Sequence, residues 1–155
     1  GHSISGAAGL IAANNTPQIK GVVNLDGDVN DDFEKIQPSQ PILYITTQPH
    51  GSKNPDTSTW NEDKSEKRRD NAFLNNAINS AKSIRIKIPE MYHLDFLDVA
   101  YYKSSLPEKY RGKSFGSIPF SKSSGIVLES ISSFIEDRED WSNLKNKYGL
   151  YIELR

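Results

Sequence analysis

Three residues that could together turn a hydroxyl group into a nucleophile occur along the chain in the order Ser3, Asp26 and His93. A serine hydroxyl is a weak nucleophile near neutral pH, so it needs a base such as histidine to take its proton. The histidine needs a carboxylate that fixes its tautomer and stabilises its charged form. The three side chains therefore predict nucleophilic catalysis by the serine, if the fold brings them together.

Ser3 lies in the segment Gly1-His2-Ser3-Ile4-Ser5-Gly6, which has the small residues of a nucleophile elbow. In such an elbow a strand turns sharply into a helix, and small residues two before and two after the serine allow close packing. Ser5 stands at the second small position, where glycine is usual. The small apolar run 7–13 predicts the helix that should follow the turn.

Asp26 and His93 each follow a predicted strand. The β-branched run 19–27 and the run 41–47 predict two buried parallel strands, the first of which ends at Asp26. Strict alternation over 84–88 predicts a half-exposed strand near the sheet edge, and His93 follows it. Because the carboxyl ends of parallel strands lie at one edge of a sheet, where ligands bind, Asp26 and His93 should meet there.

The remaining segments complete a single α/β domain over residues 1–155. Apolar periodicity predicts a helix over 68–82. It predicts a second helix that Ser123 or Ser124 caps and that reaches Ile135, and a short third helix over 140–147. The alternating tail 150–154 should pair at a sheet edge. The polar segment 49–69 predicts a mobile loop, and the aromatic-rich segment 97–121 predicts a cap-like excursion.

Several of these segments resemble an α/β-hydrolase. Gly1-His2-Ser3 with Gly6-Ala7-Ala8, residues 19–27 and 40–45, and His93-Leu94-Asp95-Phe96 are similar to the carboxyl-terminal half of the platelet-activating-factor acetylhydrolase type and to dienelactone-hydrolase-like lipases and esterases. The resemblance implies a mostly parallel sheet flanked by helices, with the amino-terminal strands of the fold absent from this chain. It also implies that the acid follows the strand after the elbow helix, where Asp26 stands.

The resemblance implies a serine esterase or lipase-like hydrolase that cleaves carboxylic esters through an acyl-enzyme. Ser3 would attack the ester carbonyl, His93 would move the proton, and Asp26 would orient His93. The backbone N–H of Ile4 would stabilise the oxyanion, together with an N–H group from the missing amino-terminal half. The implied partners are a small-molecule or lipid ester and that missing half of the fold, and no cofactor is implied.

Other assignments stay open at this point. Asp28 is an alternative acid, and Asp56 lies where more typical hydrolases have theirs, although its surroundings are very polar. A chain that begins Gly-His-Ser can carry a cloning remnant, in which case Ser3 has no chemical role. The alternative functions are a non-catalytic binding module and an acyltransferase or thioesterase with the same triad.

Composition excludes several other classes of function. The formal net charge of -1, with both signs dispersed, predicts no binding to nucleic acid, and the basic run 64–69 predicts a solvated surface. The chain has no cysteine, and its 3 histidines are too dispersed for a metal site. No apolar run approaches the roughly 20 residues of a membrane span. The compartment stays open, a secreted or periplasmic location included.

Overall fold

A computed structural model describes residues 1–27, 35–47, 62–80, 82–138 and 140–154. In these parts of the chain one 4-stranded mixed sheet has the strand order β1-β2-β3-β4. Strands β1 (Val22–Leu25), β2 (Ile42–Thr47) and β3 (Ile84–Ile88) are parallel, and β4 (Glu153–Leu154) pairs antiparallel with β3. The protein is therefore of the α/β class, as the sequence predicts, and its tail pairs at the sheet edge.

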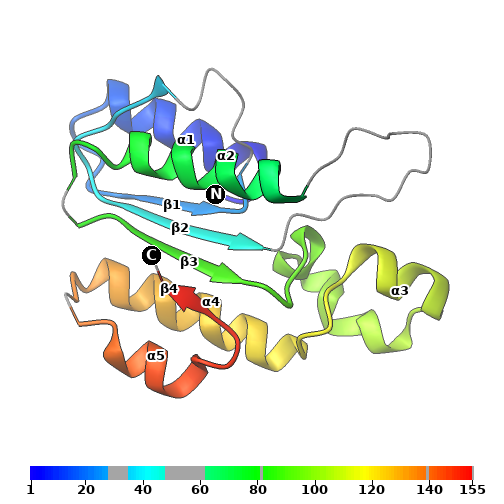
Figure 1. Ribbon diagram of the computed structural model, residues 1–155. Coiled ribbons are helices and arrows are strands. Elements are labelled where there is room, and N and C mark those ends of the chain that lie inside the picture. Colours follow the sequence, from blue (N-terminus) through cyan, green and yellow to red (C-terminus); the bar gives the residue numbers. More distant parts are fainter. Residues whose placement is uncertain (28–34, 48–61, 81, 139, 155) are drawn as a thin grey trace.

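Helices cover both faces of the sheet (Figure 1). Helices α1 (Ile4–Asn15) and α2 (Glu62–Asn76) lie on one face, and α4 (Phe120–Ile135) and α5 (Ser142–Tyr148) lie on the other. Every residue of β2 is buried as a result. A strand that is covered on both faces needs a continuous apolar run rather than an alternating one, and this is the pattern of the sequence there.

Each face has its own hydrophobic core. The core under α1 and α2 is formed by Leu10, Ala13, Val22, Ile42, Tyr44, Ala72 and Phe73. The core under α4 and α5 is formed by Leu43, Ile45, Ile86, Ile88, Met91, Ile118, Ile126, Leu144, Tyr148 and Ile152. Successive residues of β2 alternate between the two cores, because neighbouring side chains of a strand point to opposite faces.

Three short helical elements follow the carboxyl end of β3. They are η2 (His93–Phe96), η3 (Asp98–Ser105) and α3 (Glu108–Ser114), and they lie beyond the ends of the parallel strands (Figure 1). The aromatic-rich segment 97–121 is thus largely helical. Its position puts it on the side of the sheet toward which β1, β2 and β3 run.

Two helices begin earlier than the sequence predicts. Helix α2 begins at Glu62, so residues 62–69 of the expected loop are helical, and residues 48–61 lie outside the described part of the chain. The glutamate, lysine and arginine residues that are frequent in 62–69 favour a helix even without an apolar stripe. Helix α4 begins at Phe120, directly after Pro119, because proline fits well at a helix start.

Strand β3 also differs from its prediction as a half-exposed edge strand. Arg85 is 0% exposed although it stands at a polar position of the alternating pattern. Its guanidinium pairs with Asp70 of α2, and its Nε donates to the Thr46 hydroxyl at 3.2 Å. A charge can be buried at this depth only when it is paired and hydrogen-bonded.

Among the described helices, none is long and apolar enough to span a membrane.

The core under α4 predicts a sharp contrast between two aliphatic residues of that helix. Ile126 is 0% exposed and Leu128 is 66% exposed. Ile126→Ala should lower the free energy of unfolding by about 2–5 kcal/mol because it leaves a cavity. Leu128→Ala should change it by no more than about 0.5 kcal/mol. Urea unfolding of both variants measures the difference, and equal losses would contradict this description of the core.

Candidate active site

The backbone of Ser3 has the strained geometry of an elbow. Its φ is 56° and its ψ is -134°, in a region that residues with a Cβ rarely occupy. Hydrogen bonds on both sides hold the residue there. Its N–H donates to the Leu25 carbonyl at 3.0 Å, and its carbonyl accepts from the N–H groups of Gly6 and Ala7 at 2.9 and 3.3 Å.

Residues 1–3 pair with the carboxyl end of β1 before the chain turns into α1. The Leu25 N–H donates to the Gly1 carbonyl at 2.9 Å, and the Gly1 nitrogen donates to the Val23 carbonyl at 2.8 Å. His2 and Leu25 form a parallel bridge. The segment therefore runs parallel to β1 and then turns abruptly into a helix, which is the local structure that the motif predicts.

The elbow depends on close backbone packing at Gly6. A Cβ at this position would overlap the side-chain oxygen of Asn24 and the carbonyl oxygen of Gly1. Ser5, which stands at the usual glycine position of the motif, is instead exposed, and its hydroxyl donates to the His2 carbonyl at 2.6 Å. The departure from the motif is accommodated because Gly6, rather than residue 5, makes the close contact with β1.

The first turn of α1 leaves one N–H group available at Ile4. The N–H groups of the next three residues donate to the carbonyls of His2 and Ser3. The Ile4 N–H has no hydrogen-bond partner among the described residues, as is usual for the first residue of a helix. It directly follows Ser3, so it is positioned to donate to an oxygen atom that reaches the Ser3 hydroxyl.

Asp26 and His93, which are far apart in the sequence, lie in direct contact. Nδ1 of His93 is 2.7 Å from Oδ2 of Asp26. The Asp26 side chain is 1% exposed, whereas that of His93 is 40% exposed. Because an ionised carboxylate can only accept, Nδ1 is the donor, and Nε2 of the neutral imidazole is left as the acceptor.

The Asp26 carboxylate also accepts hydrogen bonds from two other elements. Thr47, at the end of β2, donates its N–H to Oδ1 at 3.0 Å and its hydroxyl to Oδ2 at 2.9 Å. Nη1 of Arg69, from α2, donates to Oδ1 at 3.0 Å. Burial by itself raises the pKa of Asp26, but the His93 hydrogen bond, the Arg69 charge and the Thr47 hydrogen bonds outweigh it, so that this pKa lies below its ordinary value.

His2 connects the elbow to His93. The two rings lie 4.5 Å apart between centroids, and Nε2 of His2 donates to the His93 carbonyl at 3.1 Å. Burial and the neighbouring His93 lower the pKa of His2.

Within the described structure no hydrogen bond joins the Ser3 hydroxyl to His93. In enzymes without bound substrate, such bonds are often long and tighten only in the complex.

An ion pair between the buried Asp95 and Lys103 stabilises the turn that contains His93. Oδ2 of Asp95 accepts from the N–H groups of Tyr92 and Gly116, at 2.8 and 2.6 Å, and Oδ1 accepts from Nζ of Lys103 at 2.8 Å. The Lys103 ammonium also donates to the carbonyls of Gly116 and Ile118. The segment after η2 therefore fixes the position of His93.

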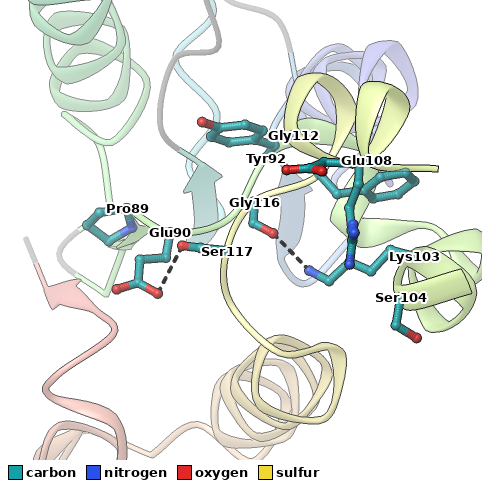
Figure 2. Close-up of a pocket in the computed structure, with 11 residues that line it drawn as sticks. Pro89, Glu90, Tyr92, Lys103, Ser104, Glu108, Gly112, Gly116 and Ser117 are labelled. Atoms are coloured by element: carbon teal, nitrogen blue, oxygen red, sulfur yellow. Dashed lines mark hydrogen bonds between the residues drawn. The ribbon is translucent and has the colours of Figure 1, made fainter. Parts of the chain in front are cut away.

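A cavity of about 590 Å³ lies next to this turn (Figure 2). It is bounded by residues that follow β3 and by η3, α3 and the chain after α3. Tyr92 is one of its lining residues, whereas Ser3, Asp26 and His93 are absent from its described lining. Lys103, drawn with its bond to Gly116 in Figure 2, is engaged with that carbonyl and with Asp95. The cavity is therefore separate from the candidate reaction centre.

The structure brings the predicted Asp26 and His93 into contact and places Ser3 at the neighbouring turn. The alternative acids Asp28 and Asp56 lie outside the described residues, as does His50. Sequence reasoning missed Thr47 and Arg69. Thr47 could have been found, since it ends a predicted strand at the same sheet edge, whereas Arg69 was assigned to a solvated surface. No metal-binding cluster occurs among the residues that the structure describes.

The fold resembles that of a known esterase. A ferulic acid esterase from Streptomyces cinnamoneus superposes with a TM-score of 0.63 over 88% of this chain and 38% of that chain, with 16% sequence identity. The chain thus spans 38% of the length of this esterase. The similarity shows an α/β-hydrolase-like fold. The sequence matches no family profile and no curated protein.

The close packing at Gly6 predicts that this glycine cannot be replaced without loss. Gly6→Ala should lower the free energy of unfolding by about 1–3 kcal/mol, because backbone and the Asn24 amide must move apart. Gly112→Ala is the matched control, since a Cβ there meets open space in α3. It should stabilise the protein by up to about 1 kcal/mol. Urea unfolding distinguishes the two, and a neutral Gly6→Ala would contradict the packing.

The lowered pKa of Asp26 predicts a loss of stability in acid. Because the folded protein holds this proton less tightly than the unfolded chain, the contribution is present above the unfolded pKa of about 3.9. It is lost as the pH falls through the lower folded value. The difference in unfolding free energy between the unchanged protein and Asp26→Asn should therefore shrink from pH 6 toward pH 2. A difference that is constant over this range would contradict the ion pairing of Asp26.

Proposed function

We propose that this protein is a serine hydrolase that cleaves carboxylic esters with Ser3, His93 and Asp26. The observation that supports this most directly is the 2.7 Å contact between Nδ1 of His93 and the buried Asp26 carboxylate, beside a serine with strained backbone geometry. The α/β-hydrolase-like fold agrees with such a reaction. The sequence resemblance favours an acetylhydrolase-like or lipase-like enzyme with a small or medium acyl group.

In the proposed reaction Nε2 of His93 takes the Ser3 proton while Oγ attacks the ester carbonyl carbon. Asp26 keeps the Nδ1 proton in place and stabilises the imidazolium that forms. The carbonyl oxygen becomes an oxyanion, to which the Ile4 N–H donates a hydrogen bond. His93 then gives its proton to the departing alcohol, and an acyl-enzyme remains on Ser3. Water, activated by His93 in the same way, releases the acid.

The outer edge of β1, which in the described part of the chain pairs only with residues 1–3, indicates where the rest of the proposed machinery would join. Residues 1–3 already pair with the carboxyl end of this edge, so a parallel strand that leads into Gly1 would continue along β1. Unpaired strand edges favour association with another strand. The proposed partner is the amino-terminal part of a hydrolase fold, which would provide the second oxyanion donor.

Labelling with a fluorophosphonate tests the proposal in the natural protein that contains these residues. The probe should attach to Ser3, as identified by mass spectrometry of the labelled peptide, because His93 activates this hydroxyl. Ser3→Ala should abolish labelling and lower kcat/KM for p-nitrophenyl acetate by at least about 10⁴-fold. His93→Ala should reduce both to a similar extent, because these residues act as a unit.

The control is Ser132→Ala, which removes an exposed hydroxyl from α4. This variant should retain labelling and hydrolysis. Unmodified Ser3 in a folded protein, or hydrolysis that survives Ser3→Ala, would overturn the proposed function and favour a non-catalytic binding module. Faster acyl transfer to an added alcohol or thiol than to water would instead identify an acyltransferase that uses the same three residues.

A further inference from the structure

The guanidinium of Arg69 lies beside the Asp26–His93 pair, on a helix that the proposed reaction does not otherwise use. Its Nη1 is 3.0 Å from Oδ1 of Asp26 and 3.1 Å from the Thr47 carbonyl oxygen. One nitrogen thus contacts both the carboxylate and the backbone at the end of β2. The Arg69 side chain is 19% exposed, so this contact is largely shielded from solvent.

The hydrogen bonds of Asp26 divide evenly between its two oxygens. Oδ2 accepts from His93 and from the Thr47 hydroxyl, and Oδ1 accepts from Arg69 and from the Thr47 N–H. The torsion that turns a carboxylate is soft in an isolated aspartate. Here, rotation away from His93 would break bonds at both oxygens. Arg69 therefore restrains the oxygen that His93 does not use, and through it the oxygen that His93 does use.

The charge of Arg69 also acts on Asp26 itself. Burial raises the pKa of Asp26, and the His93 hydrogen bond and the Arg69 charge lower it. Arg69 therefore helps to keep the carboxylate ionised, so that it accepts the hydrogen bond from Nδ1 of His93.

We propose that Arg69 is a positioning residue, which holds the Asp26 carboxylate toward Nδ1 of His93. This inference rests on the proposed function, because Arg69 acts only through Asp26 and His93. It assigns a role to one residue of the basic run 64–69, in which the sequence pattern indicates only solvated charges. Arginine suits this role because its planar group can donate to several acceptors at once.

The test measures the kinetics and the NMR signal of the His93 Nδ1–H proton in Arg69→Met. Without the guanidinium, Oδ1 of Asp26 keeps only the Thr47 N–H as a donor, so the carboxylate should turn more freely. kcat should fall about tenfold because the imidazole is less well oriented, with KM little changed. The Nδ1–H signal should broaden or disappear, because a weaker hydrogen bond protects the proton less from exchange with water.

Two further variants separate positioning from a merely structural role. Lys67→Met removes a positive charge from an exposed position of the same helix, and it should leave the Nδ1–H signal and the kinetics unchanged. Arg69→Lys keeps the charge but loses the planar donor group, so its kcat should lie between those of Arg69→Met and the unchanged protein. Thermal unfolding of each variant shows whether the fold is retained.

The outcomes distinguish this inference from the proposed function. A folded Arg69→Met protein with an unchanged Nδ1–H signal and an unchanged kcat overturns the role of Arg69, even if Ser3 is labelled and the enzyme is active. An equal loss in Lys67→Met also overturns it, because the effect would then be non-specific. A weakened Nδ1–H signal in a protein whose Ser3 never reacts supports the action of Arg69 on His93 through Asp26 and overturns the ester hydrolysis instead.

Discussion

The Asp26 carboxylate is the group on which the arrangement of the candidate site depends. It is almost fully buried at the end of β1, and it accepts hydrogen bonds from the end of β2, from α2 and from η2. A buried charge is stable only when it is paired and hydrogen-bonded. The partners Thr47, Arg69 and His93 must therefore be present together, and this requirement fixes the relative positions of four elements.

Ser3 and Asp26 reach their positions through the same structural device. Both have a positive φ, of 56° and 51°, and both donate a backbone hydrogen bond to the neighbouring parallel strand where the pairing ends. The Ser3 N–H donates to Leu25, and the Asp26 N–H donates to the Ile45 carbonyl at 2.7 Å. A hydrogen bond to the neighbouring strand thus fixes the first N–H group of each strained turn. Because both turns lie at the carboxyl edge, the serine and the carboxylate end up on the same side of the sheet.

A different set of contacts holds His93 in position. His93 contacts Asp26 from one side of η2, while Asp95, two residues later, is buried against Lys103 and the backbone of Gly116. The two aspartates have distinct tasks, since Asp26 orients the ring and Asp95 anchors the turn. The segment 97–121, which the sequence predicts to be a cap-like excursion, provides this anchor through Lys103. Its exposed tyrosines Tyr101, Tyr102 and Tyr110 take no part in these hydrogen bonds.

The sequence by itself determined the α/β class, the approximate positions of the strands, the elbow at Ser3 and the order of the three proposed site residues. Continuous β-branched runs between turn residues have few other ways to bury their side chains, and the elbow is a local pattern. Only the tertiary structure decided that Arg69 pairs with an aspartate 43 residues away and that Arg85 is buried against Asp70. The spacing of apolar residues shows which side of a single helix or strand is buried. An ion pair depends instead on how two such elements are placed relative to each other. For that reason Arg69 and Arg85, which look solvated along the chain, became members of ion pairs with a buried partner or in a buried position.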